Sequence, residues 1–502
     1  MIFRNLYLLS LFYLIFSNED LNPTLIGRVS NEGLNFVSKL GHKIVDYEIP
    51  KIEFPEIDLD IDAGPGKGKL YVDDLHIPSF ETPKFKFILE PPRSIHWISQ
   101  GGSIQAKGNI YVKYKVVIPI SFSATIHINA QDIRTNYSLS LHHLDGRPQL
   151  DVNYCDTYIK SLTLSFGGGV IPWIVNLFKT PLAAAAENAI KNQFCDTLKS
   201  VLLSQINDLL VELPTHIELG RNFFIDYDYN HIPIVTSDYV QLDAYAIISI
   251  GEEKCPYEPM KMDTYDAPND YMANFWASPA ISNCFLYSVY KQQVLKFIIN
   301  KDSGAALATL LKTSCGPYEI CLGKFFSALQ ARYPNKYVDI VIRLDDKPSI
   351  VISKTNGIVF NGILSFDFSI SPYKESDEVL ARLVSVLNAT IKPYIKNGAA
   401  KATIQDFDFV LKQEFSNIGN FSKKICEFLS NIIKPTLKKT LETLATQGFK
   451  IPMYQNFTIA STSAIVPIDN GIRFDLDLSY TKNFEKYLFK KLWNMKYLMS
   501  GF

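Results

Sequence analysis

The 502-residue chain lacks an excess of charge of either sign, with 50 Lys and Arg against 51 Asp and Glu. A protein that binds nucleic acid through a chain-wide cationic surface needs a strongly basic balance, so the sequence disfavours nucleic acid as a partner. The chain also lacks the glycine and proline content of low-complexity or collagen-like sequences. Its composition is that of a globular protein, and at about 100–200 residues per domain its length predicts two or three domains.

Motifs of common catalytic and cofactor sites are missing. The sequence contains no Gly-x-Gly-x-x-Gly, Walker loop, Gly-x-Ser-x-Gly elbow or His-Glu-x-x-His. All eight histidines precede residue 251, so the second half has no imidazole for a base or a metal ligand. Four carboxylates lie on one face of a predicted strand: Glu56, Asp58, Asp60 and Asp62. They could form a calcium site, but a solvated strand face is the favoured interpretation. We therefore expect that the protein is not an enzyme and that it has no catalytic residues, metal site or cofactor. An esterase is a distant alternative.

Long apolar runs are absent except near the N-terminus. Residues 6–16 are largely apolar, follow Arg4 and precede a polar segment. This pattern is typical of a secretory signal peptide, and the run is too short to span a bilayer. We therefore expect a signal peptide at residues 1–17 and a secreted, extracellular protein; a short N-terminal anchor is the alternative. Four sequons are compatible with glycosylation in that compartment: Asn136, Asn388, Asn420 and Asn456.

Cysteine is scarce, with seven residues in the chain. In an oxidising compartment most of them should pair, but an odd number leaves at least one free or bridging to another chain. Spacing alone does not fix the pairing. Cys315 and Cys321 lack the spacing of a zinc ribbon, so we interpret them as a local disulfide loop.

Hydrophobic periodicity predicts a first half with helices at both ends. Asn22-Pro23 opens a predicted amphipathic helix that extends to about residue 44. From residue 49 to about 164 the period changes to two, which predicts a long antiparallel meander. A long helix is predicted from Pro172 to about residue 213, with a kink at Pro181.

The second half repeats this order. A helical pattern covers residues 298–326, period-two segments follow, and a second long helix is predicted from about residue 421 to 444. The shared order of elements indicates a duplicated unit, and residues 251–283, which lack a clear period, are interpreted as a linker. A helix of about 40 residues extends roughly 60 Å, at about 1.5 Å per residue. Against a curved sheet such a helix leaves either an elongated apolar groove or a filled core.

Several segments, taken in order, resemble one known family. They are the opening Asn22–Leu34, the turn Gly66-Lys67-Gly68, the pair Cys155 and Cys195 around Trp173, and Ser416–Gly419 before the second long helix. This order and spacing resemble the bactericidal/permeability-increasing protein family, which includes lipopolysaccharide-binding protein, cholesteryl ester transfer protein and phospholipid transfer protein. The resemblance extends from about residue 21 to 483.

The resemblance implies an α+β fold: an elongated boomerang of two similar barrels, each a highly twisted antiparallel sheet with a long helix, joined by a central sheet. The expected domains are the N-terminal barrel at 18–250, the linker at 251–283, the C-terminal barrel at 284–483 and a basic-aromatic tail at 484–502. The resemblance also implies a Cys155–Cys195 disulfide. Cys255–Cys284 and Cys315–Cys321 are then guesses that leave Cys426 single.

One apolar pocket per half, holding phospholipid-like molecules, is a further implication of the resemblance. For each candidate lining residue, ordinary core packing is at least as good an explanation. The candidates are Ile26, Val29, Val37, Leu40, Trp173, Leu177, Ile190 and Phe194 in the first half, and Ile418, Phe421, Ile425, Leu429 and Ile432 in the second.

The leading functional hypothesis is a secreted, monomeric lipid-binding or lipid-transfer protein that carries phospholipids or related lipids and meets a membrane or lipoprotein surface transiently. The alternative is an antibacterial, innate-immunity protein that recognises lipopolysaccharide. That alternative would use a modest cationic patch: Lys67, Lys69, Lys107, Lys113 and Lys115. The acidic residues beside this patch favour a neutral or zwitterionic lipid instead. For the tail, a packed or frayed extension is favoured over an interfacial helix.

Overall fold

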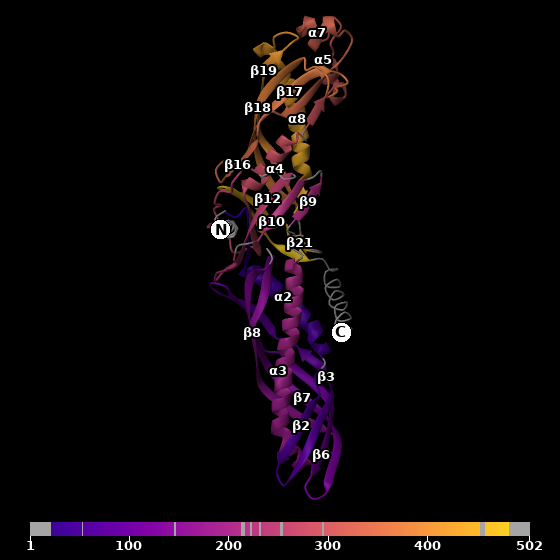
Figure 1. Ribbon diagram of the computed structural model, residues 1–502, viewed down its shortest axis with the longest axis vertical. Helices are drawn as coiled ribbons and strands as arrows, with labels where there is room; N and C mark the ends of the chain where they lie inside the picture. The colour runs from indigo at the N-terminus through magenta and orange to yellow at the C-terminus, as the bar shows by residue number, and fades with distance from the viewer. Residues whose placement is uncertain are drawn as a thin grey trace, which may run out of the picture.

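The computed structural model describes residues 22–52, 54–144, 147–211, 216–220, 223–229, 232–250, 255–293, 296–451 and 457–480. The expected signal peptide, the tail from residue 484 and Asn456 lie outside these residues. The described chain is elongated, with a barrel at each end and a sheet between them (Figure 1). The expected α+β architecture of two similar barrels joined by a central sheet is confirmed.

The N-terminal barrel wraps one antiparallel sheet along helix α3 (Pro172–Val211). Its strands form because apolar and polar residues alternate, which places one set of side chains on each face of the sheet. The sheet order is β2-β3-β6-β7-β5-β4, and β8 pairs with β7. The strands are β2 (Ile57–Ala63), β3 (Gly66–Glu81), β4 (Lys84–Glu90), β5 (Ser94–Gln100), β6 (Ser103–Lys115), β7 (Pro119–Leu144) and β8 (Arg147–Gly167).

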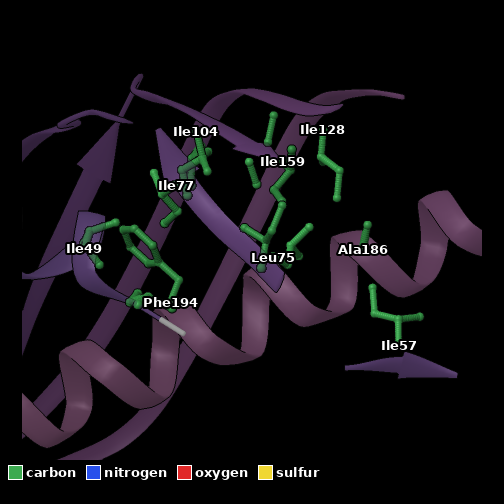
Figure 2. Packing of buried hydrophobic residues seen from close by; sticks show 14 of the residues in the cluster. Ile49, Ile57, Leu75, Ile77, Ile104, Ile128, Ile159, Ala186 and Phe194 are labelled. Carbon is green, nitrogen blue, oxygen red and sulfur yellow. The ribbon is translucent and has the colours of Figure 1, made fainter. Parts of the chain in front are cut away.

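Side chains from the sheet, from α3 and from the short helix η2 (Ile49–Lys51) fill much of this barrel. Figure 2 shows Ile49, Ile104 and Phe194 gathered between the helix and the sheet, with Ala186 further along α3. All four are buried. Core packing is therefore the main role of the face that α3 turns toward the sheet.

The helix predicted from residue 22 is wrong over its first part. Residues Leu25–Ser30 form strand β1, which pairs with β12 (Tyr239–Ile250) on one side and β13 (Ala273–Ala277) on the other. Helix α2 (Asn31–Glu48) starts only after Ser30, whose side chain accepts a hydrogen bond from the Gly33 N–H. The apolar residues of this segment suit a strand as well as a helix, and pairing on both edges decides the outcome.

The central sheet brings together the beginning, the middle and the end of the chain. Its order is β22-β23-β13-β1-β12-β10-β9, with β11 paired to β12. The remaining strands are β9 (His216–Gly220), β10 (Phe223–Asp228), β11 (Ile234–Val235), β22 (Ala464–Ile468) and β23 (Gly471–Leu476). The interpretation of 251–283 as a linker is thus corrected, because β13 lies inside it and helix α4 (Pro279–Lys291) begins there.

The C-terminal barrel repeats the sheet-and-helix arrangement on helix α8 (Lys423–Gln447). Its sheet order is β14-β15-β17-β18-β19-β20, and β16 pairs with β17. The strands are β14 (Lys296–Ile299), β15 (Val338–Leu344), β16 (Ser349–Ser353), β17 (Gly357–Ile370), β18 (Ala381–Lys396), β19 (Ala399–Ser416) and β20 (Phe449–Lys450). A separate pair, β21 (Phe457–Ile459) and β24 (Leu478–Tyr480), lies against α2, where the Phe36 and Phe457 rings are 6.1 Å apart.

The helical pattern predicted for 298–326 is realised only in short pieces. After β14 come η3 (Lys301–Ser303), α5 (Ala305–Leu310), α6 (Leu322–Phe325) and α7 (Ser327–Arg332). A loop closed by Cys315 and Cys321 separates α5 from α6. In the described part of the chain no helix is both long enough and apolar enough to cross a bilayer.

Three disulfides are present: Cys155–Cys195, Cys255–Cys284 and Cys315–Cys321. The first is the pair that the family resemblance implies, and it ties β8 to α3. The other two are the pairs guessed from the remaining cysteines. Cys426 on α8 is buried and unpaired.

Candidate functional site

An apolar cavity of about 240 Å³ lies in the C-terminal barrel, between α8 and the sheet. Five strands, α8 and α4 contribute to its walls. The lining residues are Leu286, Phe297, Ile342, Arg343, Leu344, Phe360, Leu364, Leu387, Ala389, Ile391, Ile404, Leu437, Leu441 and Ala445. All but Arg343 are apolar, so the cavity offers a ligand almost nothing but hydrocarbon contact.

Two periodicities build these walls. On β18, Leu387, Ala389 and Ile391 alternate with outward-facing residues, as strand geometry requires. On α8, Leu437, Leu441 and Ala445 are spaced by four and therefore share one helix face. Alanine stands on both walls, at 389 and 445, and these short side chains leave volume that larger residues would fill.

Arg343, the charged member of the lining, is held in an ion-pair network. Its Nη1 donates to Asp367 Oδ2 at 2.8 Å, and its Nη2 donates to the Tyr373 hydroxyl at 2.6 Å and Glu375 Oε2 at 3.3 Å. Arg382 Nε donates to the other oxygen of Asp367, which is 1% exposed. Hydrogen bonds from Lys296 and Tyr373 lower the pKa of Glu375 to about 2, so its carboxylate stays charged. The arginine charge is thus balanced by protein groups.

The residues predicted to line a pocket in the second half lie elsewhere in the barrel. Ile418, Phe421 and Leu429 are buried in its core, and Ile425 and Ile432 pack against that core. The Phe421 ring lies 4.3 Å from that of Phe326, which accounts for its burial without a ligand. None of the five lines the cavity, whose helical wall begins at Leu437. Their contact with a ligand remains a prediction.

In the first half the predicted residues are scattered. Ile190 and Phe194 are buried in the barrel core, and Leu177 packs against it. Ile26 and Val29 lie on β1 in the central sheet, where Ile26 packs with Met262 and Trp276. The other three are partly or largely exposed: Val37, Leu40 and Trp173. The predicted helix placed Ile26 and Val29 on one face with Val37 and Leu40, but the first two lie on strand β1 and the last two on helix α2.

The seam between α3 and β8 holds a second, polar hollow of about 460 Å³ around the Cys155–Cys195 disulfide. Asp156, Asp196 and Lys199 are among its lining residues. Its mixed charges distinguish it from the apolar cavity. Within the described residues, no three His, Cys, Asp or Glu side chains gather as a metal site requires.

The turn between β6 and β7 forms an exposed apolar tip at the far end of the N-terminal barrel (Figure 1). Val117 is 84% exposed and Ile118 is 72% exposed. Sequence reasoning missed this tip, although three successive aliphatic residues, Val116 to Ile118, interrupt the alternation of apolar and polar residues and are a readable signal.

Lysines accompany this tip on the neighbouring strands. Lys113 and Lys115 on β6 stand opposite Lys69 and Lys67 on β3. Lys67 pairs with Asp62 at 2.7 Å and Lys69 with Asp60 at 3.5 Å, whereas in the described chain Lys113 and Lys115 have no ion pair. The carboxylates considered as a calcium site therefore partly neutralise the predicted cationic patch.

Three of the four sequons fall on described residues. Asn388 and Asn420 are exposed. Asn136 is half-buried, and its Nδ2 donates to the Tyr154 hydroxyl at 3.3 Å. Glycosylation at these positions remains a prediction, with the two exposed asparagines the more accessible acceptors.

Comparison with known proteins supports one assignment. The family model "LBP / BPI / CETP family, C-terminal domain" matches residues 218–480, and the N-terminal-domain model of the same family matches residues 33–206. The chain is 21% identical over 456 residues to lipopolysaccharide-binding protein of Mus musculus, covering 88% of this chain and 91% of that protein. It is 22% identical over 352 residues to bactericidal permeability-increasing protein of Sebastes schlegelii, covering 68% and 71%.

A solved structure shares the fold. The crystal structure of lipopolysaccharide binding protein matches with a TM-score of 0.60 at 18% identity, covering 92% of this chain and 100% of that one. The family resemblance inferred from the sequence is confirmed, and the chain belongs to the LBP / BPI / CETP family.

Proposed function

We propose that this chain is a secreted, monomeric, non-enzymatic lipid carrier that holds an acyl chain of a phospholipid-like molecule in the C-terminal cavity. The observation that carries the proposal is the cavity itself, whose lining is apolar apart from one arginine with balanced charge. Each methylene removed from water contributes about 0.8 kcal/mol, so such a wall favours hydrocarbon strongly. Family membership supports the same conclusion.

The size of the cavity limits what it holds. At about 240 Å³ it lies below the range of about 300–1,000 Å³ common for small-molecule pockets. We therefore expect it to shelter one chain, or part of one, while the polar headgroup stays outside. A lipid held this way remains exchangeable, and transfer during transient contact with a membrane or lipoprotein surface is the expected use.

Ala389→Phe tests the proposal because the new ring occupies the cavity. Lipids extracted from the purified, secreted protein are identified by mass spectrometry, and rebinding of a fluorescent fatty acid to delipidated protein is measured. We expect acyl-chain affinity to fall at least about tenfold, the equivalent of about 1.4 kcal/mol. Val386→Phe is the matched control, since Val386 lies on the same strand but is exposed. Wild-type protein that binds no acyl chain, or an Ala389→Phe variant that binds like wild type, contradicts the proposal.

Recognition of lipopolysaccharide is the second candidate, favoured by the lysines near the N-terminal tip. Like charges directly opposite each other destabilise a sheet, so an anionic ligand would offset the part of the cost of the Lys69–Lys113 and Lys67–Lys115 registers that Asp60 and Asp62 leave. Two relatives are named for this ligand or for bactericidal action.

A double charge reversal, Lys113→Glu/Lys115→Glu, tests this candidate. Endotoxin affinity should fall, and its decrease with added salt should become shallower. Lys84→Glu/Lys86→Glu is the matched control, because both lysines are exposed on β4 of the same sheet. Unchanged endotoxin affinity in the first variant removes this candidate.

A further inference from the structure

The loop from Cys315 to Cys321 projects two apolar side chains into solvent. Tyr318 is fully exposed and Ile320 is 58% exposed. Helix α5 precedes the loop and α7 follows it after α6, and both α5 and α7 lie at the end of the molecule opposite the β6–β7 tip (Figure 1). Exposed apolar side chains therefore occur at both ends of the elongated chain.

This loop stands on a rigid base. The Cys315–Cys321 disulfide closes it, and Thr313, Cys321 and Leu322 beneath it are fully buried. Gly323 packs so tightly that a Cβ there would lie 1.8 Å from the Thr313 carbonyl oxygen. The two apolar side chains are thus presented by a fixed scaffold.

Lysines on either side of the loop bond several of its polar groups. Lys324 Nζ donates to the Pro317 carbonyl at 2.6 Å and to the Glu319 carbonyl at 2.7 Å. The Glu319 carboxylate accepts from Lys312 Nζ at 2.9 Å and from the Gly316 N–H at 3.1 Å. These donors hold the pKa of Glu319 below its usual value. Carbonyls and a carboxylate that are bonded in this way lose less on leaving bulk water than unbonded ones.

We propose that the loop 315–321 anchors the C-terminal end of the protein on a lipid surface, with Tyr318 and Ile320 entering the boundary between headgroups and acyl chains. Tyrosine suits this depth because its ring is apolar and its hydroxyl stays hydrated. Lys312 and Lys324 against Glu319 leave the loop and the two lysines that bond to it with one net positive charge, which complements an anionic surface. The proposal rests on the proposed function, since a lipid carrier must meet a lipid surface.

The exposed area of the loop is too small for a stable protein partner. One large aromatic side chain buries about 150–250 Å², whereas a standard protein interface takes about 800 Å² from each partner. Two protruding side chains fall well short of that requirement. A bilayer accepts a small wedge of this kind.

Vesicle flotation of the full secreted chain tests the anchor. The probes are vesicles of phosphatidylcholine alone and of phosphatidylcholine mixed with phosphatidylserine. In Tyr318→Ser/Ile320→Ser we expect partition to fall about tenfold to a hundredfold, with stronger wild-type partition on the anionic vesicles. Tyr265→Ser is the matched control, because Tyr265 is 87% exposed and lies outside the loop. Thermal unfolding of each variant confirms that it folds.

A spectroscopic variant reports insertion directly. In Tyr318→Trp, the tryptophan emission in excess of that of the wild-type chain, which has four tryptophans, should shift to the blue on vesicles and be quenched by brominated phosphatidylcholine. Several results overturn the proposal: wild-type chain that does not partition, a loop variant that partitions like wild type, or fluorescence that bromine leaves unquenched. Loss of partition in Val117→Ser/Ile118→Ser alone, with the loop variant unaffected, also overturns it. Fatty-acid binding is measured separately, so failure of the cavity and failure of the anchor are distinguishable.

Discussion

The two barrels share an order of elements but differ in how the long helix is held against the sheet. In the N-terminal barrel, the 40-residue α3 is bonded to β8 by the Cys155–Cys195 disulfide. In the C-terminal barrel, the 25-residue α8 carries the unpaired Cys426 and is joined to β19 by a hydrogen bond from the Leu411 N–H to Ser430 Oγ at 3.0 Å. Where the N-terminal barrel has a covalent link between helix and sheet, the described part of the C-terminal barrel has hydrogen bonds instead.

Their interiors differ in the same sense. Near its disulfide, α3 is fixed further by the Tyr137 hydroxyl, which donates to the Phe194 carbonyl at 3.2 Å. The apolar cavity lies in the other barrel, where Ala389 on β18 and Ala445 on α8 both line it. One repeat of a duplicated architecture thus has its helix fastened by a disulfide, while the other contains the apolar cavity described above.

Removing the disulfide should have the largest effect. For Cys155→Ser/Cys195→Ser, closing a loop with a sequence separation of 40 residues predicts a loss of about 4 kcal/mol in the free energy of unfolding. Cys315→Ser/Cys321→Ser should cost only about 2 kcal/mol, because its separation is 6 residues. Urea unfolding checks both. Equal losses would show that chain entropy does not govern the difference.

Adding volume to each barrel should have the next largest effect. Ala186→Phe inserts a ring into the filled core beside α3 and should cost about 3 kcal/mol. Ala389→Phe enters the cavity and should cost less than about 1 kcal/mol. Thermal unfolding of the delipidated proteins measures the two changes. Equal destabilisation would contradict the distinction between the packed surroundings of Ala186 and the cavity beside Ala389.

The pH dependence of the N-terminal barrel should show the smallest effect. Burial raises the pKa of the Tyr137 hydroxyl above its ordinary value of about 10. The folded state therefore holds this proton more tightly, so the stabilisation is complete below about pH 10 and is lost as the pH rises further. Tyr137→Phe should cost about 1 kcal/mol at neutral pH and flatten the alkaline decline.

Urea unfolding at a series of alkaline pH values measures that slope. Ser430→Ala in the C-terminal barrel is the control, since its hydroxyl does not titrate in this range. An alkaline decline that is identical in Tyr137→Phe and wild type would show that Tyr137 contributes nothing to it.

Regular periodicity made most of the fold predictable. The long helices were expected at 172–213 and 421–444, and they occupy Pro172–Val211 and Lys423–Gln447. Strands paired on both edges by distant segments were harder to find, because the partners of β1 and β13 lie about 200 residues or more away in sequence. Local patterns carry no record of such partners.

The site was less predictable than the fold. The sequence indicated that the long helices pack against the sheets, but the segment of α8 that borders the cavity, from Leu437 to Ala445, has the same periodicity as the segment that packs into the core. What separates them is the summed volume of side chains arriving from five strands. That quantity depends on register, which the sequence alone does not supply.

The position of β13 between β1 and β23 has a practical consequence. A fragment ending near residue 250 keeps β1 and β12 but loses β13, so one edge of β1 is left with unsatisfied backbone groups. Such an edge recruits other chains. Dividing the protein at the apparent boundary between its halves should therefore yield aggregates, and a fragment that extends through Ala277 moves the unpaired edge from β1 to β13, whose partner β23 is then missing.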